Sequence, residues 1–241
     1  MQTRSINAAP PATERPGRRP PRRGAAPAFP ARPARRAPLA PLALLALLAL
    51  CLALWACAGS GPALRPLAPG AVILAFGDSL THGTGAPGQG YPERLAALSG
   101  HPVVNAGIPG ERARQGLARL PGLLAAHAPA LVILCHGGND LLHGSSRAAL
   151  GGELRAMTAL CRQAGADVVL LAVPSPGVLL SSARVYEEVA RAEGVPLEAG
   201  ALAAILADAA LKSDMIHPNA RGYDQLARAV ADLLRREGAL P

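Results

Sequence analysis

Two short segments, far apart in the chain, carry residues whose types and spacing could perform nucleophilic catalysis. Ser79 ends a Gly-Asp-Ser triplet after an apolar run, and His217 follows Asp214 by three residues near the C-terminus. A serine hydroxyl attacks a carbonyl once a base takes its proton, and a carboxylate can hold that base in one tautomer. We therefore interpret Ser79 as a nucleophile, His217 as its general base and Asp214 as the residue that orients the base.

Acyl transfer through a serine also requires hydrogen-bond donors for the oxyanion that forms on the carbonyl oxygen. Gly107 lies in NAGIPG (105–110) and Asn139 lies in GGND (137–140), each where an apolar run ends. Glycine lets the backbone approach a substrate closely. We predict an oxyanion hole made by the backbone N–H groups of Ser79 and Gly107 and by the side-chain amide of Asn139.

Each of these signals has a common structural explanation when it is taken alone. Gly-Asp-Ser triplets occur in turns, Gly-Gly-Asn is ordinary loop sequence, and Asp78 or Asp140 could cap a helix. Asp214 and His217 could likewise form a pair at a helix start. The joint occurrence of all these segments in this order, at three strand ends and one helix start, favours the catalytic interpretation.

Further side chains beside these segments are candidates for contact with a substrate. They are Asp78, Leu80, His82, Asp140 and Ile216. Cys135 beside His136 does not predict a cysteine nucleophile, because adjacent side chains of a strand point to opposite faces. No group of histidines has the spacing of a zinc site, so we expect no metal.

The elements that must position these residues alternate along the chain. Apolar runs of strand length occupy residues 71–76, 102–106, 130–136, 166–173 and 194–199. Helical patterns occupy residues 91–100, 111–128, 146–165, 182–194 and 219–238, with Pro121 expected to break or kink the second. Strands joined through helices indicate a mostly parallel sheet covered on both faces. We predict an α/β fold, a three-layer α/β/α sandwich whose five-stranded sheet is doubly wound and flavodoxin-like.

The N-terminal part of the chain differs in composition from the rest. Residues 1–38 form an Arg/Pro-rich leader, which we expect to be disordered, with nine arginines and one acid, Glu14. This leader holds the whole excess of +8, so the remaining residues are neutral and give no indication of nucleic-acid binding by the folded domain. Binding of anionic surfaces by the leader itself stays an alternative.

Residues 39–58 are twenty residues without a charge, enough to span a hydrocarbon core of about 30 Å as a helix. A basic region before an apolar run is also the plan of a secretory signal. Residues 54–57, Leu-Trp-Ala-Cys, resemble a bacterial lipoprotein cleavage box with Cys57 as the lipidated residue, while Ala56-Cys57-Ala58 also fits an ordinary cleavage site. We predict an exported, periplasmic or cell-envelope protein, anchored by a lipid or by the uncleaved segment.

Residues 59–70 have the composition of a linker, and the catalytic domain is expected to cover residues 71–238. Cys135 and Cys161 fall on predicted core elements without CxxC spacing. We expect buried free thiols there rather than a disulfide.

The chain resembles the GDSL, or SGNH, hydrolases in the segments GDSLT (77–81), NAGIPG (105–110), GGND (137–140) and DMIHPN (214–219). The residues that match that family's Ser, Gly, Asn, His and acid are Ser79, Gly107, Asn139, His217 and Asp214. The stretches GLARLPGLLAAHAPALVIL and GGNDLL are similar to its bacterial arylesterase/lysophospholipase/thioesterase branch. The resemblance spans about residues 71–237 and implies a periplasmic serine esterase that cleaves acyl esters or thioesters through an acyl-enzyme, without a metal or cofactor.

Two departures leave the acyl-chain preference open. Met215 stands where that branch often has glycine, and residues 173–189 are short where the branch has a longer loop. The expected partner is a small-molecule acyl ester or a lipid. A carbohydrate O-deacetylase of the same family would use the same residues and stays an alternative. A non-catalytic envelope binding module is a further alternative, although it would not need the Asp214–His217 pair.

Overall fold

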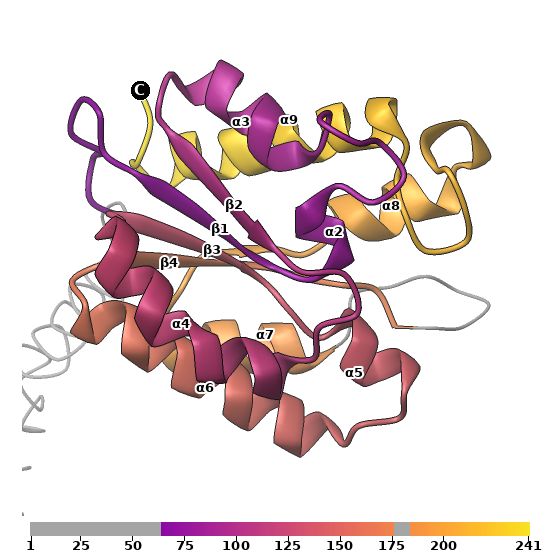
Figure 1. Cartoon of the computed structure of the whole chain (residues 1–241), viewed down its shortest axis with the longest axis horizontal. Coiled ribbons are helices and arrows are strands. Elements are labelled where there is room, and N and C mark those ends of the chain that lie inside the picture. Colours follow the sequence, from indigo (N-terminus) through magenta and orange to yellow (C-terminus); the bar gives the residue numbers. More distant parts are fainter. Residues whose placement is uncertain (1–63, 176–183) are drawn as a thin grey trace, which may run out of the picture. The chain divides into compact units, whose positions relative to one another are not determined.

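The computed structural model describes residues 64–175 and 184–241 (Figure 1). The leader, the apolar segment at 39–58 and Cys57 lie outside these ranges, and the predictions for them stay predictions. Within the described ranges, no helix combines the length and apolarity needed to cross a membrane.

Five strands form one parallel sheet in the order β2-β1-β3-β4-β5. They are β1 (Ile73–Gly77), β2 (Val103–Gly107), β3 (Leu131–Cys135), β4 (Asp167–Leu171) and β5 (Leu197–Glu198). All four neighbouring pairs are parallel, which confirms the predicted doubly wound sheet. In the register of the sheet, Gly77 of β1 is opposite Gly107 of β2 and Cys135 of β3. The segments that follow these three strands therefore leave the sheet at one edge.

Helices cover both faces of this sheet, as predicted (Figure 1). The long ones are α3 (Tyr91–Ser99), α4 (Ala113–His127), α6 (Arg147–Gln163), α7 (Arg184–Glu193) and α9 (Ala220–Arg236). Figure 1 shows α3 and α9 on one face and α4, α6 and α7 on the other. The three-layer α/β/α sandwich is thus confirmed.

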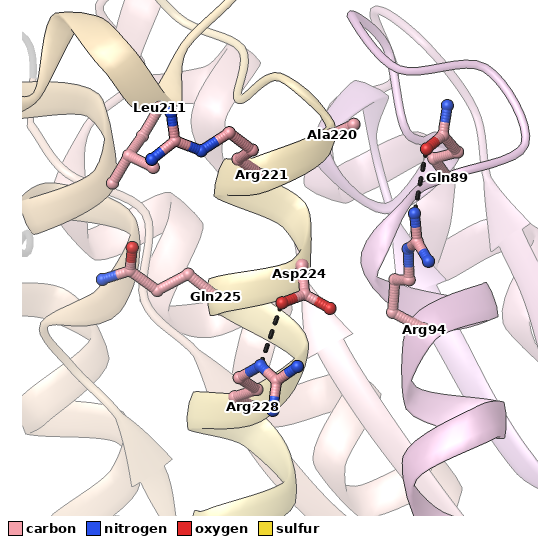
Figure 2. A pocket seen from close by; sticks show the side chains of 8 residues that line it. All are labelled: Gln89, Arg94, Leu211, Ala220, Arg221, Asp224, Gln225 and Arg228. Atoms are coloured by element: carbon pink, nitrogen blue, oxygen red, sulfur yellow. Dashed lines mark hydrogen bonds and ion pairs between the residues drawn. The ribbon is translucent and has the colours of Figure 1, made fainter.

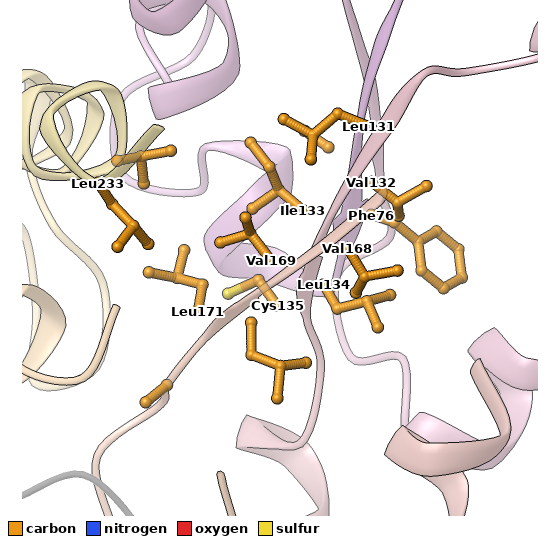
Figure 3. Close-up of a cluster of buried hydrophobic side chains, with 14 of the residues drawn as sticks. Phe76, Leu131, Val132, Ile133, Leu134, Cys135, Val168, Val169, Leu171 and Leu233 are labelled. Carbon is orange, nitrogen blue, oxygen red and sulfur yellow. The ribbon is translucent and has the colours of Figure 1, made fainter. Parts of the chain in front are cut away.

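The core lies on the central strand β3 and its neighbour β1, in which every residue is buried. Phe76 is in register with Leu134, and the two lie on the same side of the sheet (Figure 3). Ile133 is in register with Val169 on the other side, towards Leu233 of α9 (Figure 3). Packing on both faces fixes the strand ends that carry the polar segments.

Some local structure differs from the sequence-based expectation. Helix α4 continues through Pro121, so of the two expectations for this residue, a break or a kink, the break is wrong. Leu120 and Leu124 are buried against the core and hold the helix there. Three short helices were not predicted: α2 (Ser79–His82), α5 (Gly138–Leu142) and α8 (Ala201–Ala207). A 3-10 turn at Ala209–Leu211 follows α8.

The remaining expectations concern the cysteines and the chain before β1. Cys135 and Cys161 are both buried and free, as predicted. Backbone N–H groups of Leu64 and Leu67 donate to the carbonyls of Glu237 and Ala239 at the C-terminus. The described end of the predicted linker therefore packs on the domain.

Candidate active site

Ser79 is the first residue of α2 and follows β1 after a single residue. Asp78 caps that helix, because its Oδ1 accepts the N–H of Leu80 at 3.0 Å. A Cβ at Gly77 would overlap the Thr81 side chain and the Cys135 carbonyl, so only glycine fits in this turn from strand to helix. The triplet Gly-Asp-Ser thus makes a turn and also places a partly exposed serine at the edge of the sheet.

The structure brings Ser79, His217 and Asp214 together. His217 Nε2 lies 3.0 Å from Ser79 Oγ, and His217 Nδ1 lies 2.8 Å from Asp214 Oδ2. An ionised carboxylate only accepts hydrogen bonds, so the network assigns the ring proton to Nδ1. Nε2 then faces the Ser79 hydroxyl with a free lone pair, which is the arrangement that a general base needs.

Asp214 lies in the loop before α9, where the backbone holds its carboxylate. The N–H groups of Ile216 and His217 both donate to Asp214 Oδ1 at 2.8 Å. Partial burial opposes ionisation, but the hydrogen bonds from Ile216 and from the His217 ring prevail and lower the pKa of Asp214 below its ordinary value. The carboxylate therefore stays ionised at neutral pH.

Gly107 and Asn139 lie at the same edge of the sheet as Ser79. The Gly107 N–H donates to Asn105 Oδ1 at 3.1 Å. Asn139 Nδ2 donates to the Glu111 carbonyl at 3.0 Å and to Asp78 Oδ2 at 3.3 Å. Both predicted oxyanion donors are thus ordered by internal partners, and a substrate oxygen would have to share or replace one of them.

The structure explains the glycine at position 107 differently from the sequence analysis, which expected it to let the backbone approach a substrate. A Cβ there would overlap the backbone of Thr81 and His82 in α2. Gly107 therefore lets the end of β2 approach α2 closely, and this contact sets the distance between its N–H and Ser79.

Three of the predicted substrate contacts are buried: Asp78, Leu80 and Asp140. Asp140 Oδ2 accepts the Ala113 N–H at 2.9 Å, where α4 begins. Burial raises the pKa of Asp78 to about 6, and the hydrogen bond from Leu80 N–H opposes part of that shift. The structure does not place these three side chains at a substrate surface, whereas His82 and Ile216 are exposed.

The large exposed apolar side chains in the described part of the chain all lie close in sequence to the predicted site residues. They are Ile108, Leu142, Met215 and Ile216. Each lies within three residues of Gly107, Asn139 or His217 in the sequence. These four side chains, called the apolar rim below, offer a surface to an apolar group bound at Ser79.

Residues that sequence analysis did not single out form a charged cluster behind the site. Glu111 and Arg119 form an ion pair, and the buried His136 contacts the same carboxylate. From the sequence, His136 was noted only as a neighbour of Cys135. Spacing along the chain does not reveal such a cluster, because its members come from a turn, a helix and a strand end.

An open groove between α3 and α9, with a volume of about 570 Å³, lies apart from these residues (Figure 2). Arg94 and Gln89 contact each other on one side of it, and Asp224 and Arg228 contact each other on the other. None of the predicted catalytic residues lines this groove. In the described residues, no group of three His, Cys, Asp or Glu side chains could hold a metal ion.

Comparisons with known proteins agree with the fold and show the family to which the chain is similar. The model of the GDSL-like Lipase/Acylhydrolase family matches residues 75–225. Esterase TesA of Pseudomonas aeruginosa is 35% identical over 175 residues, covering 68% of this chain and 87% of TesA. Thioesterase 1/protease 1/lysophospholipase L1 of Escherichia coli is 33% identical over 165 residues, covering 61% of this chain and 75% of the relative.

Solved structures of similar proteins share the architecture. The crystal structure of TesA has a TM-score of 0.62 at 34% identity, covering 69% of this chain and 99% of that one. AlinE4, an SGNH-hydrolase family esterase, has a TM-score of 0.56 at 29% identity, covering 70% of this chain and 97% of that one.

Proposed function

This chain belongs to the GDSL-like lipase/acylhydrolase family and is a hydrolase of ester bonds, and from that premise we propose a Ser-His-Asp mechanism with an acyl-enzyme. Ser79 Oγ attacks the acyl carbonyl while His217 Nε2 takes its proton. The 3.0 Å contact between these two atoms is the observation that carries the proposal. Asp214 holds the ring proton on Nδ1 and stabilises the imidazolium that forms.

The oxyanion of the tetrahedral intermediate is held by the N–H groups of Ser79 and Gly107 and by the Asn139 amide. When the intermediate collapses, the alcohol or thiol leaves with the proton that His217 carries. Water then attacks the acyl-enzyme, and His217 again takes and returns a proton. The carboxylic acid is released and Ser79 recovers its hydroxyl.

We propose that the substrate is an ester or thioester of an apolar acyl chain. The apolar rim supports this substrate class, because exposed apolar side chains beside three of the site segments offer more apolar surface than an acetyl group can cover. Met215 is 85% exposed, so the loop between Asp214 and His217 presents an apolar side chain to solvent. The names of the relatives, esterase and thioesterase 1/lysophospholipase L1, describe the same class of bond.

The test is hydrolysis of a series of nitrophenyl esters from acetyl to palmitoyl by the full-length chain. We expect turnover that requires Ser79 and that rises with acyl length beyond acetyl. A preference for acetylated sugars over longer acyl esters would favour a deacetylase instead. Absence of turnover on every ester, from a folded chain, would favour a binding module.

We further propose that the chain is exported and anchored through residues 39–58 or through a lipid on Cys57. The basic leader before an uncharged segment supports this location. The test is cell fractionation of the wild type and of Cys57→Ala. Loss of envelope association in the variant is expected for a lipoprotein, whereas unchanged association would favour the uncleaved anchor, and a cytoplasmic chain would contradict export.

A further inference from the structure

Glu111 is connected to Gly107 and to Asn139, the two residues that complete the proposed oxyanion hole beside Ser79. It follows a tight turn in which its N–H donates to the Ile108 carbonyl at 3.2 Å, with Gly110 at φ +79°. Only a residue that tolerates positive φ fits this turn comfortably, and glycine does so. The turn brings the Glu111 side chain back beneath the edge of the sheet, where it is buried.

The Glu111 carboxylate binds two cationic or donor side chains there. Arg119 Nε donates to Oε1 at 2.7 Å and its Nη2 donates to Oε2 at 2.6 Å. His136 Nε2 lies 2.9 Å from Oε2. Burial opposes ionisation, but His136 and Arg119 prevail and lower the pKa of Glu111. A bidentate arginine on an ionised carboxylate fixes the guanidinium plane.

Arg119 connects this carboxylate to the Gly107 donor. Its Nη2 also donates to the Ala106 carbonyl at 2.7 Å and lies 3.4 Å from the Gly77 carbonyl. The Ala106 carbonyl and the Gly107 N–H belong to one planar peptide. Holding that oxygen therefore fixes the direction in which the Gly107 N–H points. Arg119 lies 4.4 Å from the centre of the Phe76 ring, which supports the guanidinium from its face.

Glu111 reaches the second donor through its own backbone. Its carbonyl accepts one hydrogen of the Asn139 amide at 3.0 Å. Because the amide is planar, fixing one hydrogen also orients the other, which donates to Asp78 Oδ2 at 3.3 Å in a bond that an oxyanion would share or replace. One residue thus orients the Gly107 N–H through Arg119 and the Asn139 amide directly.

His136 anchors the cluster to the core. A Cβ at Gly116 would overlap its ring, so the imidazole packs directly against the backbone of α4. The Tyr186 hydroxyl donates to the His136 carbonyl at 2.8 Å, at the end of β3 and three residues before Asn139. His136 Nδ1 is buried and has no partner among the described residues, so the contact with Glu111 is the one hydrogen bond of this ring there.

We propose that Glu111 and Arg119 are positioning residues that preorganise the oxyanion hole for the acyl-transfer reaction. The proposal rests on the proposed function, because it assigns a role within that mechanism. Neither side chain touches the substrate. Their effect passes through the Gly107 peptide and the Asn139 amide, so it appears in the transition state rather than in substrate binding.

The first test is Glu111→Gln in the full-length chain, with Glu193→Gln as its matched control. Glu193 also pairs with an arginine, Arg162, but on the surface between α6 and α7. We expect Glu111→Gln to lower kcat by about tenfold or more and to change KM by less than about threefold. The control is expected to keep both constants within about twofold.

A second variant and a second readout separate positioning from loss of structure. Arg119→Lys keeps the charge but lacks the planar fork that holds both carboxylate oxygens and the Ala106 carbonyl in one fixed geometry, so we expect the same fall in kcat. Rates are expressed per Ser79 that an organophosphonate labels at completion, which removes unfolded molecules from the count. A trifluoromethyl ketone forms a tetrahedral oxyanion on the serine, and its affinity is expected to fall in step with kcat/KM.

The outcomes distinguish this inference from the proposed function. Wild-type values of kcat and of trifluoromethyl ketone affinity in Glu111→Gln and Arg119→Lys would overturn the positioning role. Equal losses of ketone affinity and of binding of the product acid would overturn it as well, since they would show a general loss of the pocket. Absence of Ser79-dependent hydrolysis in the wild type would instead refute the proposed function itself.

Discussion

His217 Nε2 lies 3.0 Å from Ser79 Oγ, although 138 residues separate the two in the chain. The contact exists because the loop before α9 folds back over the end of β1. Tyr223 of α9 donates its hydroxyl to the Thr84 carbonyl at 2.9 Å and ties α9 to the segment after α2. Asn219 caps α9 by accepting the N–H groups of its first turn. These bonds fix both sides of the contact before any substrate binds.

Asp214→Asn should disable the base without unfolding the chain. An asparagine amide can donate to Nδ1 and favours the tautomer whose Nε2 carries the proton, which cannot accept one from Ser79. We expect kcat to fall by about 100-fold or more, measured with a nitrophenyl ester. Asp224→Asn, which removes a surface pair with Arg228, is the control and should keep kcat within about twofold. Equal rates in the two variants would rule out the orienting role.

Asn139→Ala should remove one oxyanion donor. Loss of such a donor raises the activation barrier by about 3–4 kcal/mol, so we expect kcat to fall by about 100- to 1,000-fold with little change in KM. Steady-state kinetics on the ester with the highest turnover measure this split. A rise in KM with kcat unchanged would place Asn139 in substrate binding and not in the oxyanion hole.

The strands and the positions of the candidate site residues were predictable for different reasons. The run at 130–135 is fully apolar because β3 is buried on both faces, and that composition alone indicates a central strand. The placement of Ser79 and Asn139 at the same edge of the sheet was predictable because the carboxyl ends of parallel strands meet there. Helices α2 and α5 were not predicted, because four or five residues are too few to show a helical period.

The charged cluster behind the site was also not predictable from the sequence. Glu111 and Arg119 are eight residues apart, and the spacing predicts no contact because Glu111 lies in a turn before the helix. His136 continues an apolar run, which indicates burial but gives no partner. Asp78 was expected at a substrate surface because it adjoins Ser79, the proposed nucleophile, yet capping α2 turns its carboxylate inward. In each of these cases the partner of the side chain depends on tertiary packing, which local sequence patterns do not show.

The carboxyl of Asp78 should make stability depend on pH. Its pKa is raised from 3.8 unfolded to about 6 folded, so the folded state binds the proton more tightly between these values. Stability should therefore fall as the pH rises from about 4 to about 6 and stay level above that. Asp78→Asn has no proton to lose, so relative to it the wild type should lose about 3 kcal/mol across this window. Urea unfolding of both chains at several pH values measures the difference, and a difference that is constant with pH would contradict the burial argument.

Gly107→Ala and Gly152→Ala form a matched pair for stability. The new methyl group at 107 would overlap the backbone of His82, so we expect a loss of about 1–3 kcal/mol in the free energy of unfolding. Gly152 is exposed within α6 with nothing near its Cβ position, so alanine there should add up to about 1 kcal/mol. Thermal unfolding of both variants checks the signs. Equal shifts would show that the β2–α2 contact is not tight.

Covalent labelling of Ser79 by an organophosphonate tests the central claim most directly. The full-length wild type, Ser79→Ala and His217→Ala are incubated with the reagent, and the modified peptide is identified by mass spectrometry. The mechanism predicts one adduct on Ser79, none on any residue of Ser79→Ala, and a labelling rate at least about 100-fold lower in His217→Ala. A folded wild-type chain that takes no label, or one that is labelled equally fast without His217, would contradict it.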